Sequence, residues 1–561
     1  MLPALFDNPV ITKELRGRMR GTRTYWLLFG YLLVLSLILF FSYLGWSAQH
    51  SSNMEVGGSE AGFTVGRTFF KTLFYSQAVM MALITPALTA GAISVEREQR
   101  TFELLRGSVL RPGAIVWGKL VSSVSFVALL LTSSLPLLSL CFLLGGVSPG
   151  EVFFAYLLLI GDAFLFGAIG LCWSAFAANT ATATVLSYLT LFLFFGLTFP
   201  FALPTFDATG FTPSFGLCAV NPVGAVTGAV LPEHYYGLTL PAWLPALLVN
   251  GTLTALLILA AMNRLEDFPA KRAAALRLVT LLFAGLLVFF GEGIAVGLPI
   301  GIGVTSAAQL IVELSLACLV LLLFVPVLVT GDMEAGRGEQ GAAKKRRQPW
   351  RVFSDATLPS GLPLALLLTA VVAGITLAAI HYETSQTVMS AFRTGSFSRG
   401  AGPRPFLAAP PPPLAAFREI GPQAAALLAL IVVGISGFGF LLSVLLNNRW
   451  SSLTLLYLAL VLAAALPFFS YATLSGEDAA AAARSPAVNS LYLCPFVPLW
   501  QLADTGNPRP DFGRDSAVVG MVGYAMWPLW IGTGTIYLSI GLASYAAAAL
   551  VIRRRKLVRT A

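Results

Sequence analysis

Residues 25–47 read YWLLFGYLLVLSLILFFSYLGWS, a stretch of apolar and small polar residues that carries no charge. A helix that crosses the hydrocarbon core of a bilayer needs about 20 such residues, so this stretch predicts a first transmembrane helix. Similar runs recur along the whole chain. The twelve predicted spans are 25–47, 73–94, 114–144, 152–175, 183–206, 242–261, 278–298, 307–330, 360–382, 422–446, 452–474 and 524–552.

The composition of the 561 residues agrees with this prediction. Hydrophobic residues make up 57% of the chain, charged residues 11%, and the mean hydropathy is +0.80, whereas soluble domains carry about 25% charged residues. These values exclude a soluble globular enzyme, a disordered chain and a nucleic-acid-binding domain. We therefore predict an all-α, polytopic membrane protein without a nucleic-acid partner.

The distribution of Lys and Arg predicts the orientation. If the N-terminus is cytoplasmic, the segments on that side hold 26 of the 35 Lys and Arg residues, while the acidic residues divide evenly between the two sides. An excess of basic residues is typical of cytoplasmic loops. The sequence thus predicts cytoplasmic N- and C-termini and a multi-pass protein of the bacterial inner (plasma) membrane.

Two weakly similar halves of six spans each, 1–270 and 271–561, are predicted from recurring landmarks. In each half one span ends in a short polar sequence and is followed directly by another span; these sequences are SAFAANT at 174–180 and SVLLNNR at 443–449. Tandem repeats of this kind are common in transporters. Two linkers are predicted in the second half, a basic cytoplasmic one at 331–358 and a Pro-rich outer one at 401–416.

The most informative polar segment is SVEREQRTFELLRGSVLRPGAIVWGK at 94–119, on the predicted cytoplasmic side. Charged residues are mixed there with apolar ones, and Thr101, Leu104, Leu105 and Ser108 recur at helical steps of three and four. A short amphipathic helix of this kind either lies on the membrane surface or fits a groove of a partner protein. The residue pattern leaves both alternatives open.

This segment resembles the type-2, exporter-like permeases of ATP-binding-cassette (ABC) transporters. Those permeases carry the pattern E-x-E-x-G-T-x-E-L-L after the second span, then a Pro and a G-K pair; here Arg100 stands in place of the Gly. The matching positions are Glu96, Glu98, Thr101, Glu103, Leu104, Leu105, Pro112, Gly118 and Lys119.

In that family the segment is the coupling helix, which docks on the ATPase subunit, and the resemblance assigns this role to residues 96–111. Residues 8–21, NPVITKELRGRMRG, resemble the family's basic interfacial helix ahead of the first span. The second half has no counterpart of the Glu-rich segment and is a degenerate unit in this respect. The residues expected to contact the ATPase are Glu96, Arg97, Glu98, Thr101, Phe102, Glu103, Leu104 and Leu105.

The chain contains no G-x-x-x-x-G-K-[ST] loop for nucleotide phosphates and no Cys/His cluster with metal-ligand spacing. We therefore expect a protein that is not an enzyme and holds no cofactor or metal, with ATP and Mg²⁺ bound by a separate P-loop ATPase subunit. The resemblance implies export of an unidentified substrate. Other expected partners are the lipid bilayer and, as an open alternative, a second permease chain.

Three acidic residues lie deep within predicted spans, namely Asp162, Glu292 and Glu313. A charge at the centre of the bilayer costs about 2.5–3.5 kcal/mol on insertion scales, so such side chains should face the protein interior. They either line a substrate or cation pathway or are paired or protonated within the structure. A pathway would also suit a secondary transporter driven by an ion gradient, and a non-transporting membrane scaffold is a further alternative.

Overall fold

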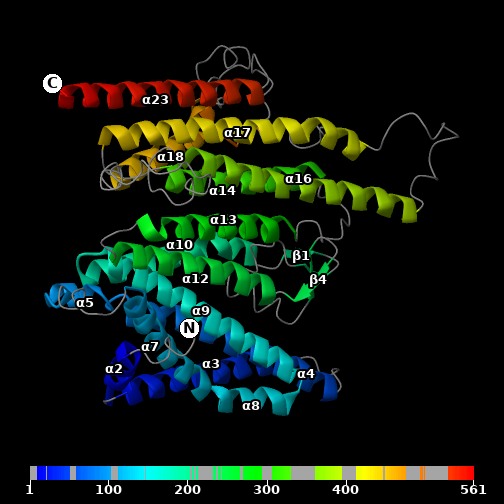
Figure 1. Ribbon diagram of the computed structural model, residues 1–561. Helices are drawn as coiled ribbons and strands as arrows, with labels where there is room; N and C mark the ends of the chain where they lie inside the picture. The colour runs from blue at the N-terminus through cyan, green and yellow to red at the C-terminus, as the bar shows by residue number, and fades with distance from the viewer. Residues whose placement is uncertain are drawn as a thin grey trace, which may run out of the picture. The chain divides into compact units, whose positions relative to one another are not determined.

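Figure 1 shows the computed structural model, in which α-helices dominate. The chain divides into two units, Met1–Val279 and Thr280–Ala561. The structure describes residues 9–19, 22–50, 58–102, 112–145, 147–202, 205–207, 210–212, 232–235, 238–241, 243–265, 270–293, 306–329, 361–394, 412–446, 449–474, 493–496, 498 and 529–560.

The first unit is built around one central helix, α9, which packs against α4, α7, α10 and α12. The amphipathic helix α2 packs against α7. The bounds are α2 (Pro9–Met19), α3 (Thr22–His50), α4 (Gly58–Thr89), α5 (Ser94–Glu98), α7 (Pro112–Ser133), α8 (Leu135–Leu144), α9 (Pro149–Phe176), α10 (Thr180–Ala202) and α12 (Trp243–Leu265).

The start of α9 shows how the local sequence specifies a helix. The Ser148 hydroxyl accepts a hydrogen bond from the Glu151 N–H (3.2 Å), and the Glu151 carboxylate accepts one from the Ser148 N–H (3.0 Å). This reciprocal pair satisfies two amides that the start of a helix leaves unpaired. Pro149, which has no N–H, occupies the first helical position. The 28 residues that follow the cap are enough to cross a bilayer core.

The second unit also has a central helix, α17, which packs against α14, α16, α18 and α23. The helix α13 begins in the first unit and ends in the second. The bounds are α13 (Ala270–Gly293), α14 (Ser306–Val329), α16 (Gly361–Thr394), α17 (Pro412–Leu446), α18 (Arg449–Leu474) and α23 (Leu529–Thr560).

The helices agree with the predicted membrane architecture. Among the described residues, seven helices are long and apolar enough to cross a membrane, and five shorter apolar helices accompany them. Every predicted span overlaps one of these helices. The prediction of an all-α, polytopic membrane protein is confirmed. The number of helices that cross the membrane and the cytoplasmic location of both termini stay predictions.

Two short β-hairpins, which no sequence pattern predicted, lie between α10 and α12 (Figure 1). β1 (Thr205–Asp207) pairs antiparallel with β2 (Gly210–Thr212), and β3 (Pro232–Tyr235) pairs antiparallel with β4 (Leu238–Pro241). Strands of three and four residues are too short to show the alternation of apolar and polar residues by which strands are recognised.

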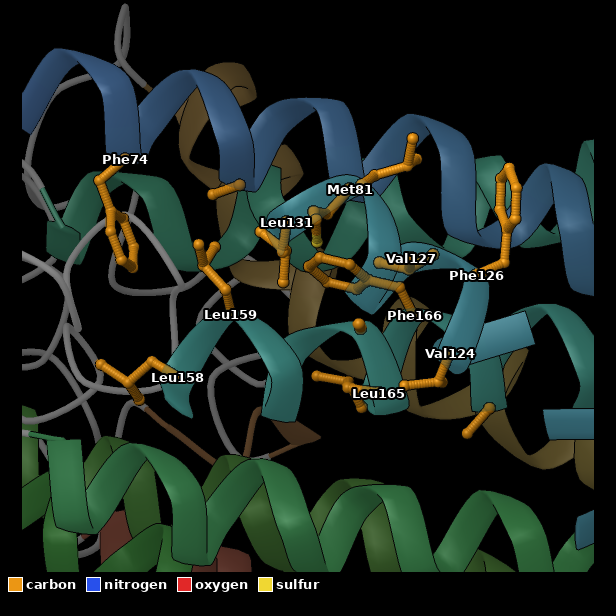
Figure 2. Packing of buried hydrophobic residues seen from close by; sticks show 14 of the residues in the cluster. Phe74, Met81, Val124, Phe126, Val127, Leu131, Leu158, Leu159, Leu165 and Phe166 are labelled. Atoms are coloured by element: carbon orange, nitrogen blue, oxygen red, sulfur yellow. The ribbon is translucent and has the colours of Figure 1, made fainter. Parts of the chain in front are cut away.

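Apolar side chains from α4, α7 and α9 fill the interior of the first unit. Figure 2 shows Met81 of α4, Leu131 and Val127 of α7 and Phe166 of α9 close together among these helices. All four side chains are buried. Because lipid tails are as apolar as these side chains, the helices associate through close packing rather than through escape from water.

A polar junction interrupts this interior between α7 and α8. Ser134 lies at the break, where its hydroxyl accepts a hydrogen bond from Nε2 of Gln77 in α4 (2.7 Å) and lies 3.0 Å from the hydroxyl of Tyr156 in α9. Both Gln77 and Ser134 are buried. The predicted span 114–144 is thus two helices joined at a hydrogen-bonded serine.

A similar hydrogen bond joins corresponding helices in each unit. Tyr188, the ninth residue of α10, donates from its hydroxyl to the carbonyl of Leu83 in α4 (2.7 Å). Tyr457, the ninth residue of α18, donates to the carbonyl of Leu323 in α14 (2.6 Å). In the predicted order of spans, α10 and α18 are the fifth of their halves and α4 and α14 the second. The equivalence of the two halves and their division at residue 270 stay predictions.

Glycines bring α17 and α23 into backbone contact; these helices lie side by side in Figure 1. A Cβ atom on Gly437 would lie 2.5 Å from the carbonyl oxygen of Gly541, and one on Gly434 would lie 2.6 Å from that of Tyr537. No larger residue fits at either position unless the helices separate. Small residues that allow such close approach are typical of helix contacts in membranes.

We expect Gly437→Ala to destabilise the second unit by about 1–3 kcal/mol, because the added methyl group overlaps the carbonyl of Gly541. The matched control is Gly374→Ala in α16, where a Cβ would meet no atom within 4 Å. Thermal unfolding of the purified variants in detergent measures both effects. Equal stabilities of the two variants would contradict the close contact of α17 with α23.

Candidate functional site

The predicted coupling segment begins in a tight turn after α4. The N–H groups of Ile93 and Ser94 both donate to the hydroxyl oxygen of Ser174 near the end of α9 (2.8 and 3.0 Å). The start of a helix leaves its first N–H groups without intrahelical partners. The Ser174 hydroxyl oxygen accepts hydrogen bonds from two such groups. All three residues are buried. The start of α5 is therefore fixed to α9.

Arg97 of α5 binds the C-terminal end of α9. Its guanidinium donates to the carbonyl oxygens of Ala175 (2.7 Å) and Ala177 (2.8 Å), which lie where a helix leaves carbonyl groups unpaired. The same guanidinium lies 5.0 Å from the centre of the Phe102 ring, within the range of a cation–π interaction. Arg97 thus connects the coupling segment with the end of α9.

Glu98 binds the N-terminal end of the following helix, α10. Its carboxylate accepts a hydrogen bond from the N–H of Thr180 (2.7 Å), the first residue of α10. A cation is stabilised at a helix C-terminus and an anion at a helix N-terminus by the helix dipole. Arg97 and Glu98 satisfy both preferences, so two adjacent side chains hold the turn between α9 and α10.

Glu96 forms part of an ion cluster with two other helices. Nζ of Lys119 in α7 lies 2.8 Å from Oε1 of Glu96 and 3.2 Å from Oε1 of Glu14 in α2. Lys119 is only 4% exposed, so this charge depends on the two carboxylates for compensation. The cluster joins the interfacial helix α2, the coupling segment and α7. We call these contacts of Glu96, Arg97 and Glu98 the α5 anchor.

Arg100 ends α5 in a left-handed conformation, with φ of 57°. Its N–H donates to the carbonyl of Arg97 (3.1 Å), and the N–H of Thr101 donates to the carbonyl of Glu96 (2.9 Å). This pair of bonds is the Schellman arrangement, which usually places glycine at the left-handed position. The family pattern has Gly where Arg100 stands, so the substituted residue keeps a glycine backbone conformation.

The predicted contact residues therefore divide into two groups. The charged side chains of Glu96, Arg97 and Glu98 bind helices of this chain, Phe102 is half-buried, and Thr101 is exposed. The remaining residues, Glu103, Leu104 and Leu105, lie outside the described residues. A contact of any of these side chains with an ATPase stays a prediction.

The three intramembrane acids lie on different helices. Asp162 is buried in α9 and bonded to Asn250 of α12. Glu292 is in α13 and Glu313 in α14, but their side chains lie outside the described residues. Their role in a pathway stays a prediction.

Sequence reasoning missed four residues of the α5 anchor and its turn. Lys119 of α7, Ser174 of α9 and Thr180 of α10 bind the coupling segment, and Glu14 of α2 binds Lys119. In the sequence, Lys119 stands out only as a match to the family pattern. Ser174 and Thr180 are the first and last residues of SAFAANT, which in the sequence is only a landmark of the predicted repeat. The sequence feature that could have identified Ser174 and Thr180 as contacts is their position next to the predicted cytoplasmic end of a span.

Comparison with known families bears on this arrangement. Residues 9–216 match the family model described as ABC-2 family transporter protein. The match covers less than half of the chain, and over these residues the chain is similar to ABC-2 family transporters. A search of curated proteins finds no match.

The ABC-2 match runs from α2 through α10 and thus includes every helix of the α5 anchor. It confirms the resemblance to ABC-2 type permeases and supports the prediction of an ABC permease. Such a permease is typically non-catalytic, and the family generally works with a partner ATPase subunit. The second unit lies beyond the match.

We expect Lys119→Met to destabilise the first unit by about 2–3 kcal/mol, because it leaves the carboxylates of Glu14 and Glu96 without their cation. A double-mutant cycle of Lys119→Met with Glu96→Gln isolates the direct interaction, with an expected coupling free energy of about 1–3 kcal/mol. Chemical unfolding in detergent provides the four free energies. Strict additivity of the two substitutions would show that Lys119 and Glu96 do not stabilise each other.

We expect Arg100→Gly to stabilise the end of α5 by about 0.5–1 kcal/mol, because glycine lacks the steric penalty of the left-handed conformation. The control is Gln99→Gly at the preceding right-handed position, which should weaken the helix end by a similar amount. Hydrogen exchange of the amides of residues 94–102 measures both. Faster exchange in Arg100→Gly would be incompatible with this helix end.

Proposed function

We propose that this chain is the membrane-spanning permease of an ABC transporter and exports its substrate with energy from a separate ATPase subunit. The observation that carries the proposal is the α5 anchor within a region that matches ABC-2 transporters. In this proposal the segment that follows α5 contacts the ATPase, while α5 itself is bonded to three helices of the permease, namely α7, α9 and α10. ATP and Mg²⁺ are bound by the ATPase.

The α5 anchor gives the proposed coupling a physical route. A displacement of residues 100–111 by the ATPase moves α5 because the two are continuous in the chain. Arg97 and Glu98 then act on the ends of α9 and α10, and Glu96 acts on α7 through Lys119. Hydrogen bonds to charged groups contribute about 1.5–3 kcal/mol each, so these contacts resist separation when the segment is moved.

The two units are proposed to be tandem six-helix permease halves within one chain. Their central helices α9 and α17, and the equivalent bonds of Tyr188 and Tyr457, support this organisation. The α5 anchor belongs to the first unit, and the sequence of the second unit lacks its Glu-rich segment. The proposed ATPase contact is therefore asymmetric within the chain.

Co-purification tests the proposal directly. We expect the tagged wild-type chain, extracted from its native membrane, to carry a P-loop ATPase with measurable ATP hydrolysis. Glu103→Lys should reduce the amount of bound ATPase at least about tenfold, because charge reversal at a docking surface costs several kcal/mol. Glu98 is unsuitable for this test because it holds α10.

The matched control is Glu477→Lys, the same charge reversal in a segment predicted to lie on the outer side. It should leave the bound ATPase unchanged. A wild-type chain that purifies without an ATPase and without ATP hydrolysis would refute the proposed function. Equal losses in both variants would show that residue 103 is not a specific docking position.

A further inference from the structure

A buried polar pair joins α9 to α12 in the middle of the first unit. Nδ2 of Asn250 donates to Oδ1 of Asp162 (3.1 Å), and each residue is only 2% exposed. Asp162 lies 13 residues from the start of α9 and 14 from its end, or about 20 Å from either end at 1.5 Å per residue. The pair is therefore remote from both ends of the helix.

Two oxygen atoms of this pair have no hydrogen-bond partner. Oδ2 of Asp162 and Oδ1 of Asn250 are both buried acceptors without a donor in the part of the chain that the structure describes. A buried acceptor without a donor is costly, and an unpaired carboxylate is far more costly. A single proton bound to the carboxyl oxygen and donated to the amide oxygen would give both oxygens a partner.

No described cation supplies that donor. Lys119 pairs with Glu14 and Glu96, and the guanidinium of Arg264 lies over the Phe176 ring at the end of α9 (5.9 Å). Among the described side chains, the hydrogen bond or ion pair that reaches Asp162 comes from Asn250 alone. Besides Asp162, the titratable residues on α9 and on the four helices packed against it are Glu151, Tyr156, Cys172, Glu60, Arg67, Lys71, Tyr75, Lys119, Tyr188 and Arg264; the side chain of Glu60 lies outside the described residues.

The packing around the pair favours a very small ligand. A Cβ atom on Gly161 would lie 2.8 Å from Cδ2 of Leu247, so α9 and α12 approach closely beside Asp162. Ala163, Ala246 and Val249 are buried on both sides of the contact. A substrate or a metal ion with its ligands requires volume here, whereas a proton requires none.

We propose that Asp162 and Asn250 form a proton-binding site between α9 and α12. The carboxylate of Asp162 takes up one proton and becomes a carboxylic acid, whose O–H donates to Oδ1 of Asn250 while Nδ2 of Asn250 donates to Oδ1 of Asp162. This paired acid and amide leave neither oxygen without a partner. Separation of α9 from α12 admits water, which stabilises the carboxylate, and the proton is released.

Infrared spectroscopy of the purified full-length chain in lipid nanodiscs tests the protonated state. At neutral pH the wild type should show the carbonyl stretch of a protonated carboxyl that Asp162→Asn lacks. In Asn250→Leu this band should persist at a higher frequency, because the acid has lost its amide partner. Isotopic labelling of aspartate should shift the band in the wild type, which keeps the test independent of how the variants fold.

The matched control is Glu151→Gln, at the exposed start of the same helix, where glutamine preserves the capping box. This variant should lose carboxylate bands and keep the protonated band. If Asp162→Asn instead loses only carboxylate bands, or if labelled aspartate shifts no protonated band, the proposal is wrong.

Unfolding provides a second readout, because it exposes Asp162 to water. The folded chain then binds one proton more than the unfolded chain above the usual carboxyl range, so its stability falls as pH rises. Between about pH 5 and pH 7 the folding equilibrium constant of the wild type should fall about tenfold more per pH unit than that of Asp162→Asn. Equal slopes would overturn the proposal. Neither measurement involves an ATPase, so failure here leaves the proposed function untouched.

Discussion

The cost of a polar group without a partner in apolar surroundings governs this structure. Backbone N–H and C=O groups within a bilayer must bond to one another, which is why runs such as residues 25–47 form helices. The same requirement acts where helices end. Ser174 satisfies the first amides of α5, Arg97 the last carbonyls of α9, and Glu98 the first amide of α10. A turn between helices thus becomes a connected unit.

The need for hydrogen-bond partners at helix ends also changes the role assigned to the charged residues of the coupling segment. A solvent-exposed row of alternating charges would be a natural partner surface, yet the side chains of Glu96, Arg97 and Glu98 bind the permease itself. They are positioning residues in the proposed mechanism, and partner recognition is left to the residues after the left-handed Arg100. A charge reversal at Glu98 would therefore disturb the permease before it tested docking.

The two units share features of helix packing but differ in the buried polar groups described for each. Each has a central helix and a tyrosine hydroxyl bonded to a backbone carbonyl of the second predicted span. The first unit adds the Ser134 junction and the pair of Asp162 with Asn250 to its interior, whereas α17 and α23 meet through glycines. Buried polar groups are costly unless they have hydrogen-bond partners. Because Asp162 and Asn250 each carry an oxygen without a partner, the proton site is proposed in the first unit.

The sequence by itself determined the membrane class, the positions of the apolar helices and the family resemblance of the coupling segment, because hydropathy, span length and local motifs are properties of contiguous residues. It did not reveal the hairpins, since strands of three or four residues carry no periodic signal. Only the tertiary structure decided that Glu96 binds Lys119 and that Asp162 binds Asn250. Those partners lie 23 and 88 residues apart in the chain, and helix packing alone determines which distant side chains meet.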